Sequence, residues 1–335
     1  MSAPESEPTV PATPERDTEQ PRALLEEALV EVKRVIAGQD EMLERVLVCL
    51  VAGGHLLIEG VPGLAKTLTI KTTAAVLGGS FRRIQFTPDL VPSDLVGTRI
   101  YRPDLGSFDV EQGPVFANFL LADEINRAPA KVQAALLEAM QEHQVTIGGT
   151  SFPLEEPFLV LATQNPIENE GTYPLPEAQL DRFMLKVRVG YPSRDEEKEV
   201  LLRMSGGQEI PVERVLEPQT ILAARSAIAE LYMDQKVVDY IVDLVRATRD
   251  PASVGLAELK PLIAFGGSPR ASISLAQAAR AHAFLRGRTY VVPEDVRALA
   301  PDVLRHRVVL TFEAEAEDTT SDDVIQRVLG AVRAP

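Results

Sequence analysis

The sequence has few of the features that mark secreted or membrane proteins. It contains a single cysteine, Cys49, so it has no internal disulfide framework and suits a reducing compartment. No apolar run approaches the ~18–20 residues that a membrane-spanning helix needs. The opening residues, MSAPESEPTV, lack the basic start and the apolar stretch of a signal peptide. These absences predict a cytoplasmic protein without a membrane span.

Positive charge is also scarce. The chain has 49 acidic and 34 basic residues, a net charge of −15. A surface of that sign repels phosphate backbones at long range, so no nucleic-acid partner is expected, although a local basic groove stays possible. The apolar content of 45% and the length of 335 residues are enough for a core and about two domains.

The order of predicted elements indicates two domains after a short tail. Residues 1–20 are rich in Pro, Glu, Ser and Thr and are expected to form a disordered tail, followed by a helix over 21–35. Helical segments then separate short apolar strands, which predicts a parallel sheet covered on both faces. The predicted strands are 55–59, 83–86, 119–122, 158–162 and 184–189.

The pattern changes near residue 192. Ser193 with Glu196 forms a capping box, and the chain reads as helical from there to its end. Within this part, Ser268 and Pro269 look like an N-cap followed by proline at the first helical position. We therefore expect an α/β domain over 21–192 and an all-α domain over 193–335.

Residues 60–67, between a predicted strand and a helix over 66–77, form a glycine-containing loop. Backbone N–H groups of such a loop and the helix dipole make an anion site. Lys66 would reach the β- and γ-phosphates of a nucleotide, and the Thr67 hydroxyl would ligate Mg²⁺. The strict pattern has glycine where this chain has Ala65, which adopts positive φ less readily. The expected nucleotide contacts here are Gly60, Val61, Pro62, Gly63, Leu64, Ala65, Lys66, Thr67 and Leu68.

Two further strands end in polar side chains. Asp123 and Glu124 follow the apolar run 119–122, and α/β proteins place ligands at the carboxyl ends of strands. Asp123 would hold the Mg²⁺ shell, and Glu124 would orient or deprotonate the water that attacks the γ-phosphate. Asn165 ends the strand around 158–162 and could bond the γ-phosphate or this water. By itself, an asparagine before proline is more often a turn residue.

Together these segments resemble the MoxR family of AAA+ ATPases. The resemblance rests on residues 60–67, on 122–129 (Ala-Asp-Glu-Ile-Asn-Arg-Ala-Pro) and on 162–166 (Ala-Thr-Gln-Asn-Pro). Residues 35–39, 180–183 (Leu-Asp-Arg-Phe) and 268–271 (Ser-Pro-Arg-Ala) also match, and alanine at position 65 is usual in that family. The resemblance spans about residues 22–335. It implies a P-loop AAA+ core, with a parallel five-stranded sheet between helices, followed by an all-α lid.

The resemblance also implies roles for single residues. Asn165 matches the sensor 1 position, and Arg182 matches the arginine finger that acts in trans on a neighbouring subunit. Arg270 matches sensor 2 on the lid, in cis or in trans. From the residues alone, a surface ion pair is the more common role for both arginines. The segment expected to line the adenine contains Val35, Ile36, Gly38 and Gln39. A helix-2 insert is expected over 101–116 and a hairpin over 145–152.

In function, the resemblance implies a Mg²⁺-dependent ATP hydrolase that assembles into a ring, typically a hexamer. Such proteins act like chaperones on a protein partner, often one with a von Willebrand factor A domain. Three alternatives stay open: a chelatase-type subunit that drives metal insertion, a nucleic-acid motor, and a nucleotide switch with negligible turnover. The segment 145–152 has no Lys or Arg, which speaks against the motor. The presence of both Asp123 and Glu124 speaks against the switch.

Overall fold

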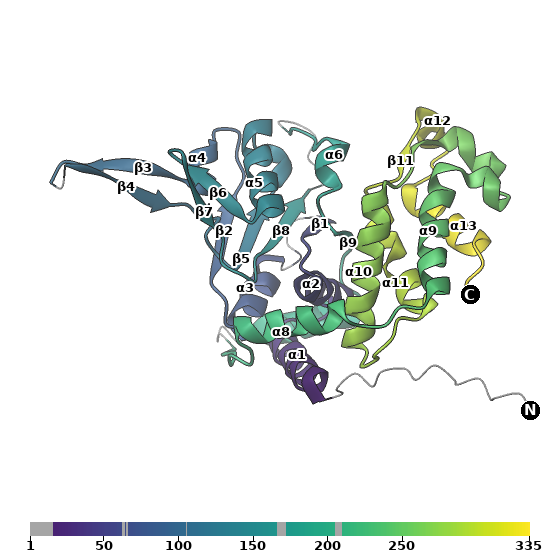
Figure 1. The fold of residues 1–335 in the computed structure, drawn as a ribbon, viewed down its shortest axis with the longest axis horizontal. Helices are drawn as coiled ribbons and strands as arrows, with labels where there is room; N and C mark the ends of the chain where they lie inside the picture. The colour runs from purple at the N-terminus through teal and green to yellow at the C-terminus, as the bar shows by residue number, and fades with distance from the viewer. Residues whose placement is uncertain (1–15, 62–63, 65, 105, 166–171, 205–209) are drawn as a thin grey trace, which may run out of the picture.

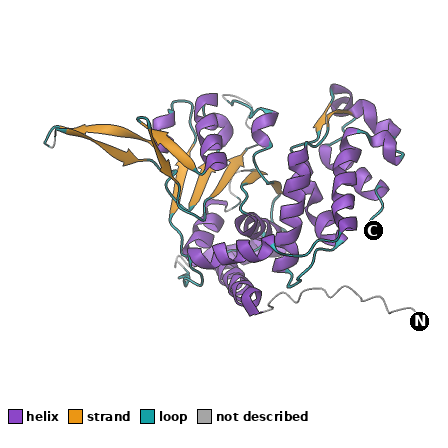
Figure 2. Cartoon of the chain, viewed as in Figure 1, coloured by secondary structure: helices purple, strands orange, loops and turns teal. Residues whose placement is uncertain are grey.

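The computed structural model describes residues 16–61, 64, 66–104, 106–165, 172–204 and 210–335. An α/β core carries the N-terminal half, and a helical lid lies beside it (Figure 1). The strands gather in the core and in a projecting arm, whereas the lid is almost wholly helical (Figure 2). This arrangement confirms the predicted fold class.

The central sheet is parallel and has the order β2-β5-β8-β1-β9. Its strands are β1 (Leu56–Gly60), β2 (Phe81–Gln85), β5 (Phe119–Asp123), β8 (Leu159–Gln164) and β9 (Leu185–Val189). In register, Gln85 pairs with Asp123, and Glu59 with Gln164. Because the strands are parallel, their carboxyl ends meet along one edge, which is where this class of sheet binds ligands.

Helices cover both faces of the sheet, as alternate strand residues show. On β5, Leu121 packs with one apolar cluster, and its neighbour Leu120 packs with a second cluster on the opposite face. The first cluster includes α1 (Arg16–Val35), α2 (Asp40–Ala52), α3 (Lys66–Val76) and α8 (Pro218–Ala229). The second lies under α4 (Pro92–Val96) and α5 (Ala130–Glu142). A short 3-10 turn, η1 (Ile125–Arg127), joins β5 to α5.

Two β-hairpins extend the core. The first, β3 (Gly97–Arg102) with β4 (Ser107–Gln112), forms the arm at the left of Figure 1. The second pairs β6 (Gln144–Ile147) with β7 (Thr150–Pro153), where a hairpin over 145–152 was expected.

The projecting hairpin begins four residues earlier than the predicted insert. Gly97, at φ +99°, lets β3 start directly at the end of α4, and a Cβ there would lie 2.2 Å from the Glu111 carbonyl oxygen. At the other end, Val115 is fully buried in the second apolar cluster. The expected range 101–116 was therefore placed too far along the chain.

The first helix also begins earlier than predicted, at Arg16, so residues 16–20 of the expected tail are helical and its residues 1–15 lie outside the described residues. Pro21 lies inside this helix. As the sixth residue of the helix it lies beyond the first turn, and the helix continues without the backbone N–H that proline lacks. The expectation of a disordered tail to residue 20 was thus too long at its C-terminal end.

After α6 (Glu177–Leu180), the part predicted as all-α begins with α7 (Arg194–Met204), and the predicted capping box is present, with Ser193 N–H donating to Glu196 at 2.7 Å. Both α7 and α8 contact the core helix α1, and the helical lid follows them in the chain. Its elements are α9 (Gln235–Arg249), η2 (Pro251–Val254), η3 (Ala257–Leu262), α10 (Pro269–Leu285), α11 (Pro293–Leu304), α12 (Phe312–Ala316) and α13 (Ser321–Ala331). A small antiparallel pair, β10 (Ile263–Phe265) with β11 (Val309–Leu310), interrupts the helices that the sequence predicted. Among the described residues, no helix is both long and apolar enough for a bilayer crossing.

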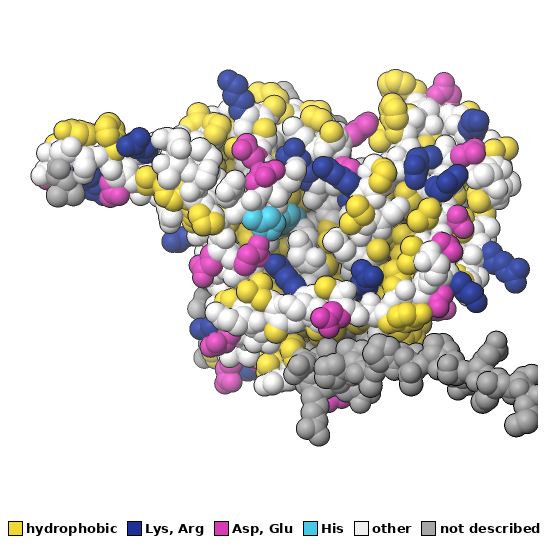
Figure 3. Space-filling model, in the orientation of Figure 1, with side chains coloured by type: hydrophobic (Ala, Val, Ile, Leu, Met, Phe, Trp, Pro, Cys, Tyr) yellow, Lys and Arg dark blue, Asp and Glu magenta, His cyan; other side chains and the backbone are white. Residues whose placement is uncertain are grey.

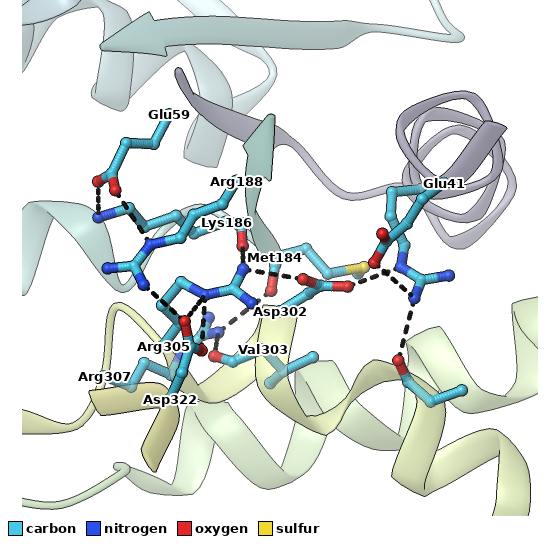
Figure 4. Close-up of polar contacts among 12 residues, drawn as sticks. Glu41, Glu59, Met184, Lys186, Arg188, Asp302, Val303, Arg305, Arg307 and Asp322 are labelled. Atoms are coloured by element: carbon cyan, nitrogen blue, oxygen red, sulfur yellow. Dashed lines mark hydrogen bonds and ion pairs between the residues drawn. The ribbon is translucent and has the colours of Figure 1, made fainter. Parts of the chain in front are cut away.

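Charged side chains join the lid to β9 and to α2 of the core (Figure 4). Arg305, just after α11, donates to the Lys186 carbonyl of β9 at 2.5 Å and to Asp302 at 2.9 Å. From the core, Arg45 of α2 donates to the same Asp302 at 2.6 Å, and both of these side chains are buried. These contacts fix the lid against β9 and α2.

Candidate active site

The phosphate loop leaves β1 and enters α3. Gly60 closes β1, and a Cβ on it would lie 2.6 Å from the Val189 carbonyl oxygen, so a larger residue would push β1 away from β9. The Lys66 ammonium donates a 2.6 Å hydrogen bond to the Gly60 carbonyl. Three predicted contacts lie outside the described residues: Pro62, Gly63 and Ala65.

A cavity of about 490 Å³ opens where the loop meets the strand ends. Its size is that of a small-molecule site. Eight of the predicted residues line it: Gly60, Leu64, Lys66, Thr67, Leu68, Asp123, Glu124 and Asn165. Four other residues that the sequence did not suggest also line the cavity: Arg83, Gln85, Thr163 and Gln164. The fold thus brings the loop, both carboxylates and Asn165 together in one place.

Thr163, on β8, links the two acidic residues. Its hydroxyl donates to Asp123 Oδ1 at 2.6 Å and accepts the Glu124 backbone N–H at 2.8 Å. The side chain is buried, at 2% exposure. Because β5 and β8 are adjacent and parallel, one hydroxyl at the end of β8 can hold both groups at the end of β5.

Glu124 has a constrained backbone and an engaged carboxylate. Its φ of 56° is left-handed, a conformation uncommon for residues other than glycine. Its Oε2 accepts from Gln85 Nε2 at 2.6 Å and from Arg127 Nη1 at 3.0 Å. The carboxylate is therefore aimed by two elements, β2 and η1. Arg127 had no assigned role in the sequence.

Positive charge balances the two carboxylates inside the cavity. Arg83 Nη2 donates to Asp123 Oδ2 at 2.6 Å. Burial lowers the pKa of the Lys66 ammonium from its ordinary value, and the charges of Asp123 and Glu124 act in the opposite direction. An anion entering this cavity would meet Lys66 and Arg83 beside backbone N–H groups of the α3 start.

The residues that were missed lie on predicted strands or directly after them, but their positions alone do not mark them as site residues. Arg83 and Gln85 alternate on one face of a predicted strand, and Thr163 comes two residues before Asn165. Only the order of the sheet reveals their importance, because it places β2 and β8 on either side of β5.

The segment expected to line the adenine lies between α1 and α2. Val35 and Ile36 are buried in the first apolar cluster, while Gly38 and Gln39 turn the chain with φ of 69° and 59°. None of these four is among the described residues that line the cavity. Val61 likewise packs against the first cluster. Their nucleotide contacts stay predictions.

Arg182 and Arg270 lie elsewhere, in a second cavity of about 280 Å³ between the core and the lid. Asp181, His55 and Gln277 also line it. Figure 3 shows this face hollowed between the two parts, with Lys and Arg side chains near the rim. The structure thus brings the two predicted arginines to each other and not to Lys66 of the same chain.

The sheet order, the phosphate loop and the paired carboxylates define a P-loop nucleoside triphosphatase with a helical lid. Two family models match the chain and agree with this class. The model of the ATPase family associated with various cellular activities matches residues 55–185, and that of the AAA lid domain matches residues 257–328.

Relatives narrow the class further. The chain is 56% identical to "Chaperone MoxR1" of Mycobacterium tuberculosis over 93% of its own length and 82% of that protein. It is 43% identical to the uncharacterized protein YeaC of Bacillus subtilis, over 93% of this chain and 95% of that one. A crystal structure of a Cytophaga hutchinsonii protein superimposes with a TM-score of 0.91 at 49% identity, covering 96% of this chain and 98% of the other.

The chain belongs to the MoxR family of AAA+ ATPases, as the sequence motifs predicted. These relatives favour neither the chelatase nor the nucleic-acid alternative.

Proposed function

We propose that this chain hydrolyses Mg²⁺-bound ATP within a ring of subunits, and that hydrolysis remodels or activates a protein partner. The observation that carries the proposal is the meeting of Lys66, Thr67, Asp123 and Glu124 in one cavity of about 490 Å³. Cation, hydroxyl and carboxylates are the groups that phosphoryl transfer to water requires.

The cavity suits a nucleotide with its metal ion. Lys66, now bonded to the Gly60 carbonyl, is free to exchange that acceptor for phosphate oxygens. Thr67 and Asp123 offer the oxygen ligands that Mg²⁺ prefers, and Mg²⁺ sites usually take only one or two protein ligands. When bound, the metal neutralises charge on the phosphates. Asp123 is already oriented for this by Thr163 and Arg83.

Glu124 acts on the attacking water in this proposal. Its carboxylate enters the cavity from the strand end, and Gln85 and Arg127 hold one of its oxygens. Asn165, at the end of the neighbouring strand, lines the same cavity and would bond the γ-phosphate or the water. A carboxylate placed in this way accepts a proton as the water attacks.

Arg182 and Arg270 both act in trans in this proposal. Each lines the cavity between core and lid and neither lines the phosphate cavity. Arg182 lines this cavity, and a planar guanidinium that is always charged can bind phosphate oxygens through two parallel hydrogen bonds. A ring, typically a hexamer in this family, would place this cavity against the neighbour's γ-phosphate.

Replacing Arg182 tests the trans assignment. Arg182→Ala is expected to lower ATP turnover at least about 1,000-fold, as loss of an arginine finger does. ATP affinity should stay within a few-fold of wild type, because the phosphate loop is untouched. Turnover is measured by phosphate release and affinity by titration with a fluorescent ATP analogue. Equal loss of ATP binding and turnover would contradict the assignment of Arg182 as an arginine finger.

The partner is proposed to be a protein, in line with a relative named as a chaperone. A protein with a von Willebrand factor A domain is the first candidate, and the net charge of −15 makes nucleic acid a poor one. The single cysteine fits action in the cytoplasm. Affinity purification of the tagged wild-type chain with ATP, compared with Lys66→Ala, would test this. Enrichment of nucleic acid in place of a protein would contradict it.

A further inference from the structure

Arg307, just beyond α11, has a buried guanidinium that forms hydrogen bonds with the segment carrying Arg182. Its side chain is 2% exposed. Nη2 donates to the carbonyls of Asp181 at 3.1 Å and of Phe183 at 2.8 Å, one on each side of Arg182. Nη1 donates to the Met184 carbonyl at 3.1 Å, as Figure 4 also shows. Arg307 thus bonds three carbonyls around the predicted finger, and His306 Nε2 donates to one of them, that of Phe183, at 3.0 Å.

The remaining N–H donors of Arg307 are also hydrogen-bonded. Nε donates to Asp181 Oδ1 at 2.6 Å, and Nη1 also donates to the Val303 carbonyl at 2.5 Å. Every N–H direction of the guanidinium therefore has an acceptor. Burial lowers the pKa of Arg307 from its ordinary value, and Asp181 acts against that shift. Five fixed donors are a property of arginine that lysine, with one nitrogen, lacks.

Asp181 extends the contact to the second arginine. Its other oxygen, Oδ2, accepts from the Ser268 hydroxyl at 3.0 Å. That hydroxyl caps α10 by accepting the Arg270 backbone N–H at 3.1 Å. A continuous path therefore runs from Arg307 through Asp181 and Ser268 to the backbone of Arg270.

We propose that Arg307 is a positioning residue that, through Asp181 and Ser268, holds Arg182 and Arg270 in the arrangement that completes the neighbouring subunit's active site. The inference rests on the proposed trans action of the two arginines. It gives roles to Asp181 and Ser268, which belong to sequence motifs but have no part in the phosphate cavity. The position of the lid would thereby control catalysis in the neighbouring subunit.

Arg305 supplies a matched control. It lies two residues away and also joins lid to core, by bonds to Asp302, Asp322 and the Lys186 carbonyl. None of its partners flanks Arg182 or caps α10. Arg305→Lys should destabilise the lid contact as Arg307→Lys does, without moving the two arginines.

The test uses rings mixed from full-length subunits. Arg307→Lys alone should lower kcat roughly ten- to a hundredfold, since misplacing a catalytic group by about 1 Å has this cost. Its KM for ATP should barely change, and Arg305→Lys should keep near-wild-type kcat. Mixing Arg307→Lys with excess Lys66→Ala subunits, which lack a working phosphate loop but carry intact arginines, should restore hydrolysis at the Arg307→Lys sites.

Arg182→Ala mixed with Lys66→Ala shows separately whether arginines act in trans. If that mixture recovers and the Arg307→Lys mixture does not, the positioning inference is overturned while the trans proposal survives. If the Arg182→Ala mixture stays inactive, the trans proposal is wrong and the inference falls with it.

Should Arg307→Lys fail to fold, Ser268→Ala replaces it. It should show the same rescue, with Ser268→Thr near wild type, and Thr320→Ala removes a comparable cap on α13 as its control. Loss of turnover with Thr320→Ala equal to that with Ser268→Ala would also count against the inference.

Discussion

Thr163 links two groups of the candidate active site through a single hydroxyl. It joins Asp123 to the Glu124 backbone, two groups with different tasks in the proposed reaction. The sequence predicted the loop, the carboxylates and Asn165, because strand ends and glycine loops mark such residues locally. It could not single out Thr163, Gln85 or Arg83, since their contacts arise only when separate strands become neighbours.

Thr163→Val is predicted to lower kcat by roughly 10-fold and stability by about 1–3 kcal/mol, since it leaves the Glu124 N–H unpaired in the interior. Steady-state phosphate release and urea denaturation measure the two effects. Thr163→Ser keeps the hydroxyl and serves as control, with activity close to wild type. A fully active Thr163→Val enzyme would show that the link is not needed for catalysis.

At the scale of elements, a charged cluster fastens the lid helices to the core. His282 of α10 lies between Asp295 of α11, at 2.6 Å, and Glu44 of α2, at 3.2 Å. Burial lowers the pKa of His282, but its hydrogen bonds to the two carboxylates outweigh this, so the pKa is raised overall. The hydrogen bond from His282 and the charge of Arg286 help lower the pKa of Glu44 to about 2.

The sign of the pH dependence follows from these shifts. His282 has a folded-state pKa above its ordinary 6.5, so its stabilisation is complete below about pH 6.5 and is lost as pH rises through the folded pKa. Glu44 contributes above about pH 4.5 and loses its contribution as pH falls towards 2.

His282→Gln is therefore predicted to reduce the free energy of unfolding by about 1–3 kcal/mol at pH 6. The loss should become smaller as the pH rises through the raised folded-state pKa of the ring, where the wild type gives up this proton. Urea denaturation at a series of pH values measures this difference. A destabilisation that grows with pH would contradict the assigned protonation of His282.

Element boundaries show where local sequence signals end. Ser193 and Glu196 predicted a helix start correctly, because a capping box is a contact between near neighbours. The projecting hairpin was misplaced by four residues, since its start depends on Gly97 meeting the opposite strand. The β10–β11 pair joins residues more than 40 positions apart and carries no local signal.

At the scale of the molecule, the lid and the core share one apolar cluster, which runs from Leu25 of α1 to Val332 after α13. Asp302 bridges the two parts, bound by Arg45 from the core and Arg305 from the lid. The predicted boundary near residue 192 therefore marks a change in secondary structure, whereas the apolar core that stabilises the molecule continues across it.

Asp302→Asn should cost about 3–5 kcal/mol, because it removes the buried carboxylate shared by Arg45 and Arg305, whose other carboxylate partners are more exposed. Thermal unfolding should also split into two transitions as the lid loosens from β9. Calorimetry of wild type and variant, with the exposed Asp318→Asn as control, measures both effects. A single transition at the wild-type temperature would mean that the shared apolar cluster alone holds the parts together.

The central claim is that this cavity hydrolyses ATP with Glu124 acting on the water. Glu124→Gln should retain ATP affinity within a few-fold but release phosphate at least about 100-fold more slowly than wild type, as loss of a general base does. Glu138→Gln, an exposed change on α5, should match wild type. If wild type releases phosphate no faster than Glu124→Gln, the chain is a nucleotide switch and the claim is wrong.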